Sequence, residues 1–452
     1  MHITQNKNKF IKLLFAIALP VMIQHFISST LNFADNIMVT SIHEEAVVAT
    51  GISNQLFYIF MVVIGGLSSA TTILVSQFYG KKDNDNILRT VKTSMYSAVT
   101  LGILFYFIIS NLKLPIIHLF TDDNLVISET IKYLSIMSAS FLLVPITSVL
   151  ASAARAKTNT KTPTIASVIA LLTNTMLNYL LIFGNYGFPK LEIEGAAIAT
   201  VMARIIELLI LIILLNKSSS GLHVFNIFKS KASSLLINKI LKLGSPLIVA
   251  NGVWVIGSTY HIAVYTKLGT ETATAIHITN TIQNMLMIIF IGLGVASSVL
   301  IGRSIGANKN SEAISISSNT ITLTIFSGLI LGILLLMSYP IILNAYNINI
   351  LTRKYTEQIL IVTSILITLR MFNHILFSGI ITGGGDAKFS MILNLIMTPL
   401  VSIPTIYIAA FIFKLPIHLI VALTSIEEII KAYIAYSRFK SNKWIHNLVH
   451  EH

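Results

Sequence analysis

The feature of the sequence that decides the fold is a long apolar stretch near the N-terminus, residues 10–38, with the sequence FIKLLFAIALPVMIQHFISSTLNFADNIM. Few polar residues interrupt it, and it exceeds the roughly 20 residues that a helix needs to cross a bilayer. Comparable stretches recur along the chain, for example over residues 195–215. Spans of a transmembrane β-barrel would be about ten residues long and would alternate in polarity, which these stretches do not. The sequence therefore predicts an all-α polytopic membrane protein.

The composition supports this class. Of the 452 residues, 54% are hydrophobic and 11% are charged, whereas soluble domains carry about 25% charged residues. The chain has no cysteine, which excludes disulfides, thiolate metal sites and cysteine nucleophiles. Three lysines precede the first apolar stretch, but that stretch is too long for a signal peptide and no small-residue cleavage pattern follows it. We therefore expect it to remain in the mature protein.

The positive charge indicates how the chain is oriented in the membrane. We place twelve spans at about residues 12–38, 47–79, 91–112, 128–152, 163–184, 195–216, 243–266, 274–302, 314–339, 356–382, 390–412 and 418–437. Of the 31 Lys and Arg residues, 21 lie in the N-terminus, the even-numbered loops and the tail, seven lie at the odd-numbered loops and three lie within spans. The positive-inside rule puts both termini in the cytoplasm, in a bacterial-type inner membrane. No nucleic-acid partner is needed to explain the net charge of +13.

An internal repeat divides the chain into two halves. A shift of 226 residues places the first two spans on the seventh and eighth, and it pairs Pro20 with Pro246, Asn54 with Asn280, and Gly66 with Gly292. Residues 151–162 match residues 378–389 at a shift of 227, and residues 115–117 match residues 340–342 at a shift of 225. Each half holds an even number of spans, so the halves share one orientation and relate by an axis along the membrane normal. We expect two pseudo-symmetric six-helix bundles around a central cleft, an architecture typical of transporters.

The repeat also predicts the domain boundaries. Residues 217–242 are rich in Ser, Lys and Asn and are interpreted as a cytoplasmic linker. The N-terminal lobe then covers residues 1–216, the C-terminal lobe residues 243–438, and a cytoplasmic tail residues 439–452.

Asp35 is the strongest candidate among the acids within spans. Gln24, Ser28, Asn32 and Asp35 follow one another at spacings of four, four and three, which puts them on one helical face. An ionisable group within a membrane is costly and is by default a functional candidate. A polar stripe of this kind indicates a water-filled cleft, and the alternative is an interfacial or capping Asp near the helix end.

Other polar residues within the spans have a structural interpretation beside a functional one. Glu207 follows Arg204 by three residues and can pair with it, and Glu427 and Glu428 can pair with Lys431. His261 occupies the repeat position of Asp35; it is a candidate proton carrier, although a lone membrane histidine is more often a packing residue. Pro20 is a possible hinge, or harmless if it lies near the helix start. We expect the substrate cleft to include Gln24, Ser28, Asn32, Asn54, Asn251, Trp254, Asn280 and Asn373.

The sequence offers no enzyme motif. Residues 383–385 are three glycines, but no Lys-Ser/Thr pair follows them and no strand precedes them, so they do not form a phosphate loop. There is no HExxH or GxSxG motif and no room for an ATPase domain. We expect no cofactor, no metal site and no catalytic residues, and an energy source other than bound nucleotide.

Three stretches carry a resemblance to the multidrug and toxic compound extrusion (MATE) family over nearly the whole chain. They are residues 19–20 with 33–38 (LP and FADNIM), residues 174–200 (NTMLNYLLIFGNYGFPKLEIEGAAIAT) and residues 383–388 (GGGDAK). The resemblance implies two six-helix lobes around a V-shaped cleft and the export of organic cations and other amphipathic compounds in exchange for H⁺ or Na⁺.

The resemblance also implies which residues couple the ion. Asp35 matches the family's coupling Asp, and Asn174 and Thr200 match its polar neighbours on the fifth and sixth spans. Asn178 stands where many members have Asp, so one acid of that cluster is missing here. Trp254 and Met371 stand where many Na⁺-coupled members have acids, which disfavours a Na⁺ site in the second lobe.

These observations lead to a hypothesis of exchange. Burial among apolar helices favours the neutral form of Asp35, so its charge can be neutralised by H⁺, or less readily by Na⁺, in competition with a cationic substrate. We expect a monomer in contact with membrane lipid. The nearest alternative is a lipid-linked saccharide flippase of the same wider superfamily, which would need a more basic cleft. A membrane-embedded enzyme or a channel fits the repeat less well.

Overall fold

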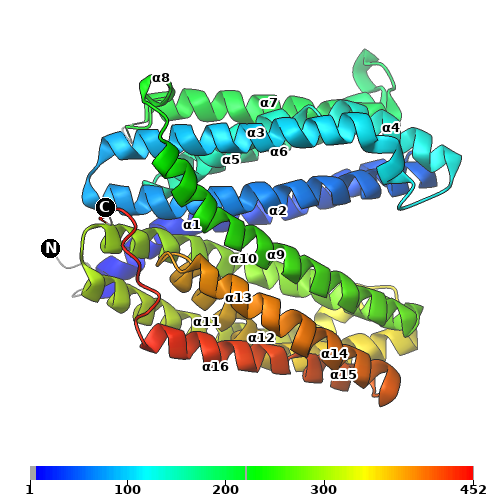
Figure 1. Cartoon of the computed structure of the whole chain (residues 1–452). Helices are drawn as coiled ribbons and strands as arrows, with labels where there is room; N and C mark the ends of the chain where they lie inside the picture. Colours follow the sequence, from blue (N-terminus) through cyan, green and yellow to red (C-terminus); the bar gives the residue numbers. More distant parts are fainter. Residues whose placement is uncertain (1–6, 219–220, 451–452) are drawn as a thin grey trace. The chain divides into compact units, whose positions relative to one another are not determined.

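The described chain is helical throughout (Figure 1). The computed structural model describes residues 7–218 and 221–450. Its main helices are α1 (Lys7–Thr40), α2 (Glu44–Lys81), α3 (Asn84–Ile117), α4 (Asn124–Met137), α5 (Ser140–Ala156), α6 (Lys161–Phe183), α7 (Glu192–Lys217), α8 (Val224–Lys229), α9 (Ser234–Lys267), α10 (Thr270–Gly306), α11 (Asn310–Asn344), α12 (Ile350–His374), α13 (Ala387–Met397), α14 (Ile403–Tyr407), α15 (Ile417–Thr424) and α16 (Ile426–Lys440). π-Helical turns at Ile375–Ile381, Thr398–Ser402 and Ile408–Ile412 prolong α12, α13 and α14.

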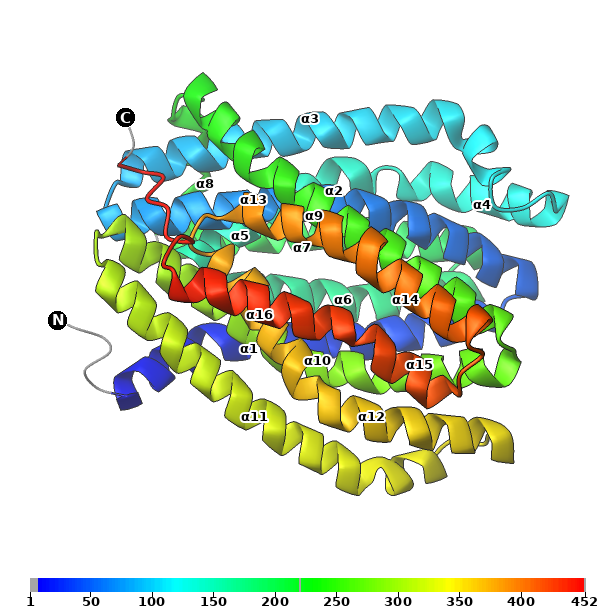
Figure 2. The same cartoon turned by 60° about the horizontal axis from the view of Figure 1, so that its bottom comes forward.

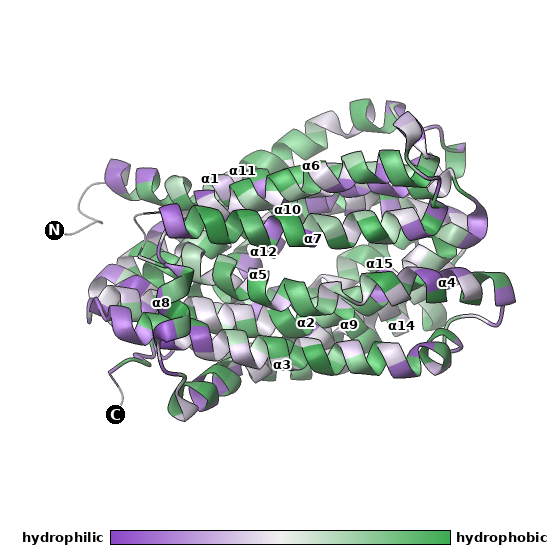
Figure 3. Cartoon of the chain, turned by 90° about the horizontal axis from the view of Figure 1, so that it is seen from above, coloured by the Kyte–Doolittle hydropathy of each residue, from purple (hydrophilic) through white to green (hydrophobic). Residues whose placement is uncertain are grey.

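The helices confirm an all-α polytopic membrane protein. Ten of them in the described ranges are long and apolar enough to cross a membrane, and the pair α4 and α5, bent by 48°, makes up to eleven. Apolar residues cover most of the helix lengths, and hydrophilic residues gather near the helix ends (Figure 3). The predicted fourth span is this bent pair. The predicted twelfth span is interrupted at Ser425, and its second part, α16, begins with Glu427 and Glu428 in its first turn. The interruption leaves two helices, α15 and α16, each too short to cross a membrane alone.

The chain forms two compact units, and it passes between them within helices. One unit comprises the described parts of residues 1–22 and 249–452, and the other comprises Ile23–Ile248. Each change of unit falls two residues after a proline inside a helix, Pro20 in α1 and Pro246 in α9. The stretch predicted as a linker contains α8, and α9 already begins at Ser234 rather than near residue 243.

Two glycines related by the repeat explain how each unit accommodates the helix segment that enters it. In the Ile23–Ile248 unit, a Cβ on Gly66 of α2 would lie 3.0 Å from the carbonyl oxygen of Gly244 in α9. In the other unit, a Cβ on Gly292 of α10 would lie 2.8 Å from the carbonyl oxygen of Ala18 in α1. Backbones approach this closely only where no side chain intervenes. The duplication of Gly66 as Gly292 thus reflects the same close helix crossing in both halves.

In the Ile23–Ile248 unit, α2 packs against α3, α4 and α5, and α7 packs against α4, α5 and α6. A buried cluster joins α1, α2, α4, α6 and α7, and it includes Val39, Ala49 and Ala196. The small side chains of α2 and α7 let the helices come close, so that polar residues of α1, α4, α6 and α7 can meet around one space.

In the other unit, α10 is surrounded by α11, α12 and the π-helical turn that follows α12. Figure 2 shows α11 and α12 side by side along most of their length. The residues after α16, predicted as a cytoplasmic tail, pack on this unit: Trp444 is fully buried in its core, and the backbone N–H of His446 donates to the carbonyl oxygen of Gly384 (2.9 Å). The glycine-rich segment at residues 383–385 therefore serves as a packing surface for the end of the chain.

Candidate functional site

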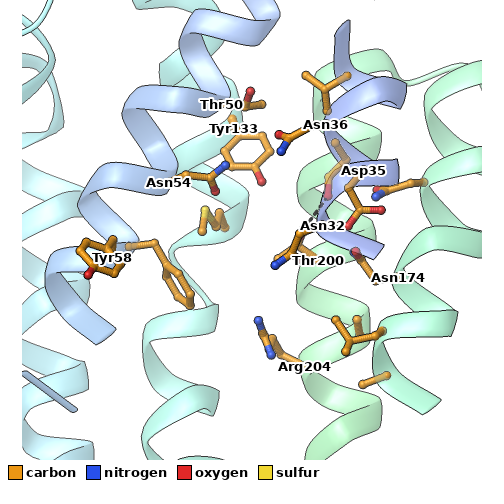
Figure 4. A pocket seen from close by; sticks show the side chains of 18 of the residues that line it. Asn32, Asp35, Asn36, Thr50, Asn54, Tyr58, Tyr133, Asn174, Thr200 and Arg204 are labelled. Atoms are coloured by element: carbon orange, nitrogen blue, oxygen red, sulfur yellow. Dashed lines mark hydrogen bonds between the residues drawn. The ribbon is translucent and has the colours of Figure 1, made fainter. Parts of the chain in front are cut away.

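A cavity of about 390 Å³ lies within the Ile23–Ile248 unit (Figure 4). Five helices contribute to its wall. The lining residues are Asn32, Asp35, Asn36 and Val39 of α1; Thr50, Asn54, Phe57, Tyr58 and Met61 of α2; Tyr133 and Met137 of α4; Ala170, Leu171, Asn174 and Asn178 of α6; and Ala196, Thr200, Ala203 and Arg204 of α7. Amide and hydroxyl groups mix with apolar and aromatic side chains, as is common in sites that bind small molecules.

Asp35 is held by hydrogen bonds from α6. Thr175 Oγ1 donates to Asp35 Oδ1 (3.3 Å). In the orientation that satisfies both ends of its amide, Asn174 donates from its nitrogen to Asp35 Oδ2 (2.6 Å) and accepts from the backbone N–H of Thr200 (3.3 Å). Asn178 also makes a side-chain hydrogen bond to the carboxylate, and its own Oδ1 is buried without a hydrogen-bond partner among the described residues. The carboxylate is thus positioned by neutral donors.

Asp35 has no ion-pair partner in the part of the chain that the structure describes, whereas the other charged residue of the wall is paired. Arg204 Nη1 lies 2.9 Å from Glu207 Oε2, one turn further along α7. Figure 4 shows the Arg204 side chain reaching into the cavity on the far side of Thr200 from Asp35. Because Glu207 compensates Arg204, the charge that the cavity presents is that of Asp35.

The structure brings together most of the residues that the sequence assigned to the first lobe. Asp35, Asn174, Asn178, Thr200, Asn32 and Asn54 all line the cavity. Gln24 and Ser28 share a face of α1 with Asp35, but they do not line the cavity. Ser28 lies seven residues before Asp35, which is about 10 Å along a helix. Helical periodicity predicts one polar face of α1, and it does not tell where along that face the cavity ends.

The predicted residues of the second half lie in the other unit. Asn251, Trp254 and Asn280 are exposed side chains of α9 and α10, while Asn373 of α12 is buried and bonded to Glu428. His261 Nε2 lies 3.0 Å from Ser402 Oγ. Two further predicted residues belong to the first half of the sequence: Glu207 is paired with Arg204, and Pro20 lies inside α1.

Sequence reasoning missed three contributors to the site. Thr175 directly follows Asn174, and its contact with Asp35 was within reach of a helical-face argument. Arg204 was interpreted only as a partner of Glu207, although it lines the cavity. Tyr133 is nearly fully buried and hydrogen-bonded to the Thr200 side chain; only the packing of α4 against α7 brings it there, and nothing local in the sequence signals it.

Comparison with known proteins identifies the family. The family model MatE matches residues 20–180 and 246–408, one segment in each half of the chain. The chain belongs to this family. It is a MATE-family efflux transporter, and its apolar helices make it a multi-pass membrane protein.

Relatives from bacteria extend over much or nearly all of the chain. "Uncharacterized transporter YisQ" of Bacillus subtilis is 23% identical and covers 96% of this chain and 94% of its own length. "Probable multidrug resistance protein YoeA" of Bacillus subtilis is 25% identical over 82% of this chain and 81% of its own. "Probable multidrug resistance protein NorM" of Thermotoga maritima is 24% identical over 72% and 70%.

Solved structures of other transporters show the same fold as this MATE transporter. The Vibrio cholerae MATE transporter VcmN superposes with a TM-score of 0.88 at 15% identity, covering 96% of this chain and 97% of that one. A MOP superfamily transporter from Pyrococcus furiosus superposes with a TM-score of 0.85 at 17% identity, covering 96% of each chain.

Proposed function

We propose that this transporter exports organic cations or amphipathic compounds by exchanging them for H⁺, and less readily for Na⁺, through alternating access. The observation that carries the proposal is Asp35: a carboxylate without an ionic partner among the described residues, held by neutral donors in the wall of a cavity. Several relatives bear the name of multidrug resistance proteins, which agrees with an amphipathic substrate.

The charges around the cavity explain why a cation is the preferred substrate. Asp35 and Arg204 are the two charged residues of the wall, and Glu207 neutralises Arg204. An ionised Asp35 therefore leaves the cavity with one uncompensated negative charge. A unit charge 4 Å away interacts with it by about 4 kcal/mol at an effective dielectric constant of 20. Tyr58, Phe57 and Met61 supply the apolar and aromatic surface that an amphipathic molecule needs.

Exchange follows because substrate and coupling ion compete for the same negative charge. A proton on Asp35 removes the charge that retains a cationic substrate, and a bound substrate favours the ionised carboxylate. By linkage, each weakens the binding of the other. Neutralisation also changes the demand for donors from Asn174 and Thr175, so α1 can rearrange relative to α6, and Pro20 in α1 offers a place to bend.

The ligand set favours H⁺ over Na⁺. The site contains one carboxylate, and the neighbouring side chains are the neutral Asn174, Asn178 and Thr200. Hard cations are usually held by several oxygens, and a second charge would strengthen binding. A proton needs only the one carboxylate.

The experiment that tests the proposal is transport of ethidium into everted vesicles or proteoliposomes under an imposed proton gradient or Na⁺ gradient. We expect proton-driven transport in the wild type, and in Asp35→Asn a loss of at least about tenfold, equivalent to about 1.4 kcal/mol or more. Asp122→Asn is the matched control, because this acid is fully exposed and its variant should transport normally. Transport driven by Na⁺ alone would contradict proton coupling. No transport under either gradient would favour the lipid-linked saccharide flippase.

The same vesicles test the orientation. The distribution of Lys and Arg predicts that both termini lie in the cytoplasm, so a protease-cleavable tag at either end should be accessible in everted vesicles and protected in intact cells.

A further inference from the structure

The unit that comprises residues 1–22 and 249–452 contains two neighbouring acids in α16 with different partners. Glu427 Oε1 lies 2.5 Å from Lys431 Nζ, and both side chains are largely buried. Glu427 is therefore committed to an ion pair. Glu428 has no ion-pair partner in the described ranges; its carboxylate is bound to a neutral amide. The two neighbouring acids therefore differ in their partners: Glu427 pairs with a cation, and Glu428 is bonded to a neutral amide.

Asn373 of α12 holds Glu428 at two points. Its Nδ2 donates to the backbone carbonyl of Glu428 (2.8 Å) and to the side-chain Oε2 (2.5 Å). Asn373 is 4% exposed, and its Oδ1 has no hydrogen-bond partner among the residues described. Buried amide oxygens normally accept at least one hydrogen bond, so this oxygen lacks a donor in the state that the structure represents.

The same arrangement occurs at Asp35. Asn178 makes a hydrogen bond to the Asp35 carboxylate and is also buried, and its Oδ1 likewise has no partner within the described chain. The other buried side-chain atoms without a partner there are hydroxyl oxygens of Ser and Thr. Both orphan amide oxygens thus belong to an asparagine that is bonded to a carboxylate within a span.

Protonation supplies the missing donor. An ionised carboxylate only accepts hydrogen bonds, whereas a carboxylic acid also donates one. An acid and a primary amide can pair through two hydrogen bonds, from amide N–H to the acid carbonyl and from acid O–H to the amide oxygen. We propose that Glu428 is a second proton-binding site of this transporter. It takes one proton from the aqueous phase to become a carboxylic acid paired with Asn373, and it returns that proton when it ionises.

The charged and titratable surroundings of Glu428 allow both states. Charged and histidine side chains on α16 and on the elements around it include Glu427, Lys431, Arg438 and Lys440 of α16, Arg370 and His374 of α12, His418 of α15, Lys388 of α13 and His261 of α9. Glu427 and Lys431 cancel each other. His418 is bonded to Gln358 (3.1 Å) and His261 to Ser402. Arg370 is bonded to Gln283.

Infrared difference spectroscopy tests the proposal without requiring transport. The full-length protein in lipid nanodiscs is taken through a pH titration, and the carbonyl band of protonated carboxyl groups is recorded for wild type, Glu428→Gln, Asp35→Asn and Asp122→Asn. We expect Glu428→Gln to remove one titrating component and Asp35→Asn to remove a different one. A Glu428→Gln spectrum identical to that of the wild type would overturn the proposal. Ethidium transport is measured separately, so failure of the exporter function and failure of this site are distinguishable.

Asn373→Ala provides the second test, because it leaves Glu428 in place. Loss of the amide partner should shift the frequency of the component that Glu428→Gln removes, and should leave the Asp35 component unchanged. Size-exclusion elution and melting temperature verify the fold of each variant. If Glu428→Gln does not fold, the Asn373→Ala spectrum decides alone: a wild-type spectrum in that variant would overturn the proposal.

Discussion

The two units carry related sequences but distribute charge differently. At a shift of 226, Asp35 corresponds to His261; at a shift of 227, Thr200 corresponds to Glu427 and Arg204 to Lys431. In the Ile23–Ile248 unit, the acid of the first helix has no ionic partner among the described residues. In the other unit, a hydrogen bond joins His261 to Ser402, and Glu427 pairs with Lys431 on the same helix.

This difference shows how one duplicated scaffold can serve two purposes. Glu427 and Lys431 form a buried pair within α16, which cancels their charges where solvent is scarce. Arg204 and Glu207 also form a pair, but the Arg204 side chain is 33% exposed and lines the cavity. Removing one member of the first pair would leave a buried charge without its partner. The second leaves Asp35 as the one charge without an ionic partner among the described residues of the cavity wall, where we propose that a substrate or a proton neutralises it.

The largest effect should come from breaking the buried pair of α16. Glu427→Gln leaves Lys431 charged and without its partner, and breaking a buried ion pair costs about 3–5 kcal/mol. We expect the melting temperature of the purified transporter, measured by tryptophan fluorescence, to fall clearly. The double variant Glu427→Gln/Lys431→Met removes the charge as well and should recover most of the loss. An unchanged melting temperature in the single variant would show that the pair does not stabilise this unit.

The second effect concerns the coupling ion and sharpens the role assigned to Asp35. Asn178→Asp places a second carboxylate beside Asp35 and gives a hard cation two charged ligands. We expect Na⁺ to raise the melting temperature of this variant and to bind about tenfold more tightly than to the wild type, equivalent to about 1.4 kcal/mol. K⁺ at equal ionic strength is the control for general salt effects. Equal stabilisation of wild type and variant by Na⁺ would mean that the native site already binds this ion.

The sequence was sufficient for those features that depend on local pattern. Apolar stretches, the Lys and Arg distribution and the repeat indicate the helices, and the resemblance placed Asp35 beside Asn174, Asn178 and Thr200, which the structure brings to one cavity. The sequence alone could not identify contacts between residues of different helices. Helical periodicity tells which face carries Glu428 but not that Asn373, 55 residues away, donates to it. Tyr133 joins the cavity only because α4 packs on α7. The sequence did not predict that α9 begins at Ser234, because the Ser, Lys and Asn residues of 217–242 were interpreted as a linker.

The smallest effect should come from the paired charge at the edge of the cavity. Glu207→Gln leaves Arg204 positively charged, so the cavity wall with ionised Asp35 becomes neutral overall. Because Arg204 is partly exposed, water screens most of its charge and the fold should survive. At a separation of about 10 Å and an effective dielectric constant of about 40, the added repulsion is about 0.8 kcal/mol. Binding of a cationic dye, measured by fluorescence polarisation, should therefore weaken about fourfold. A neutral dye of similar size should bind as before. Equal weakening of both dyes would show that Glu207 maintains the shape of the cavity rather than its charge.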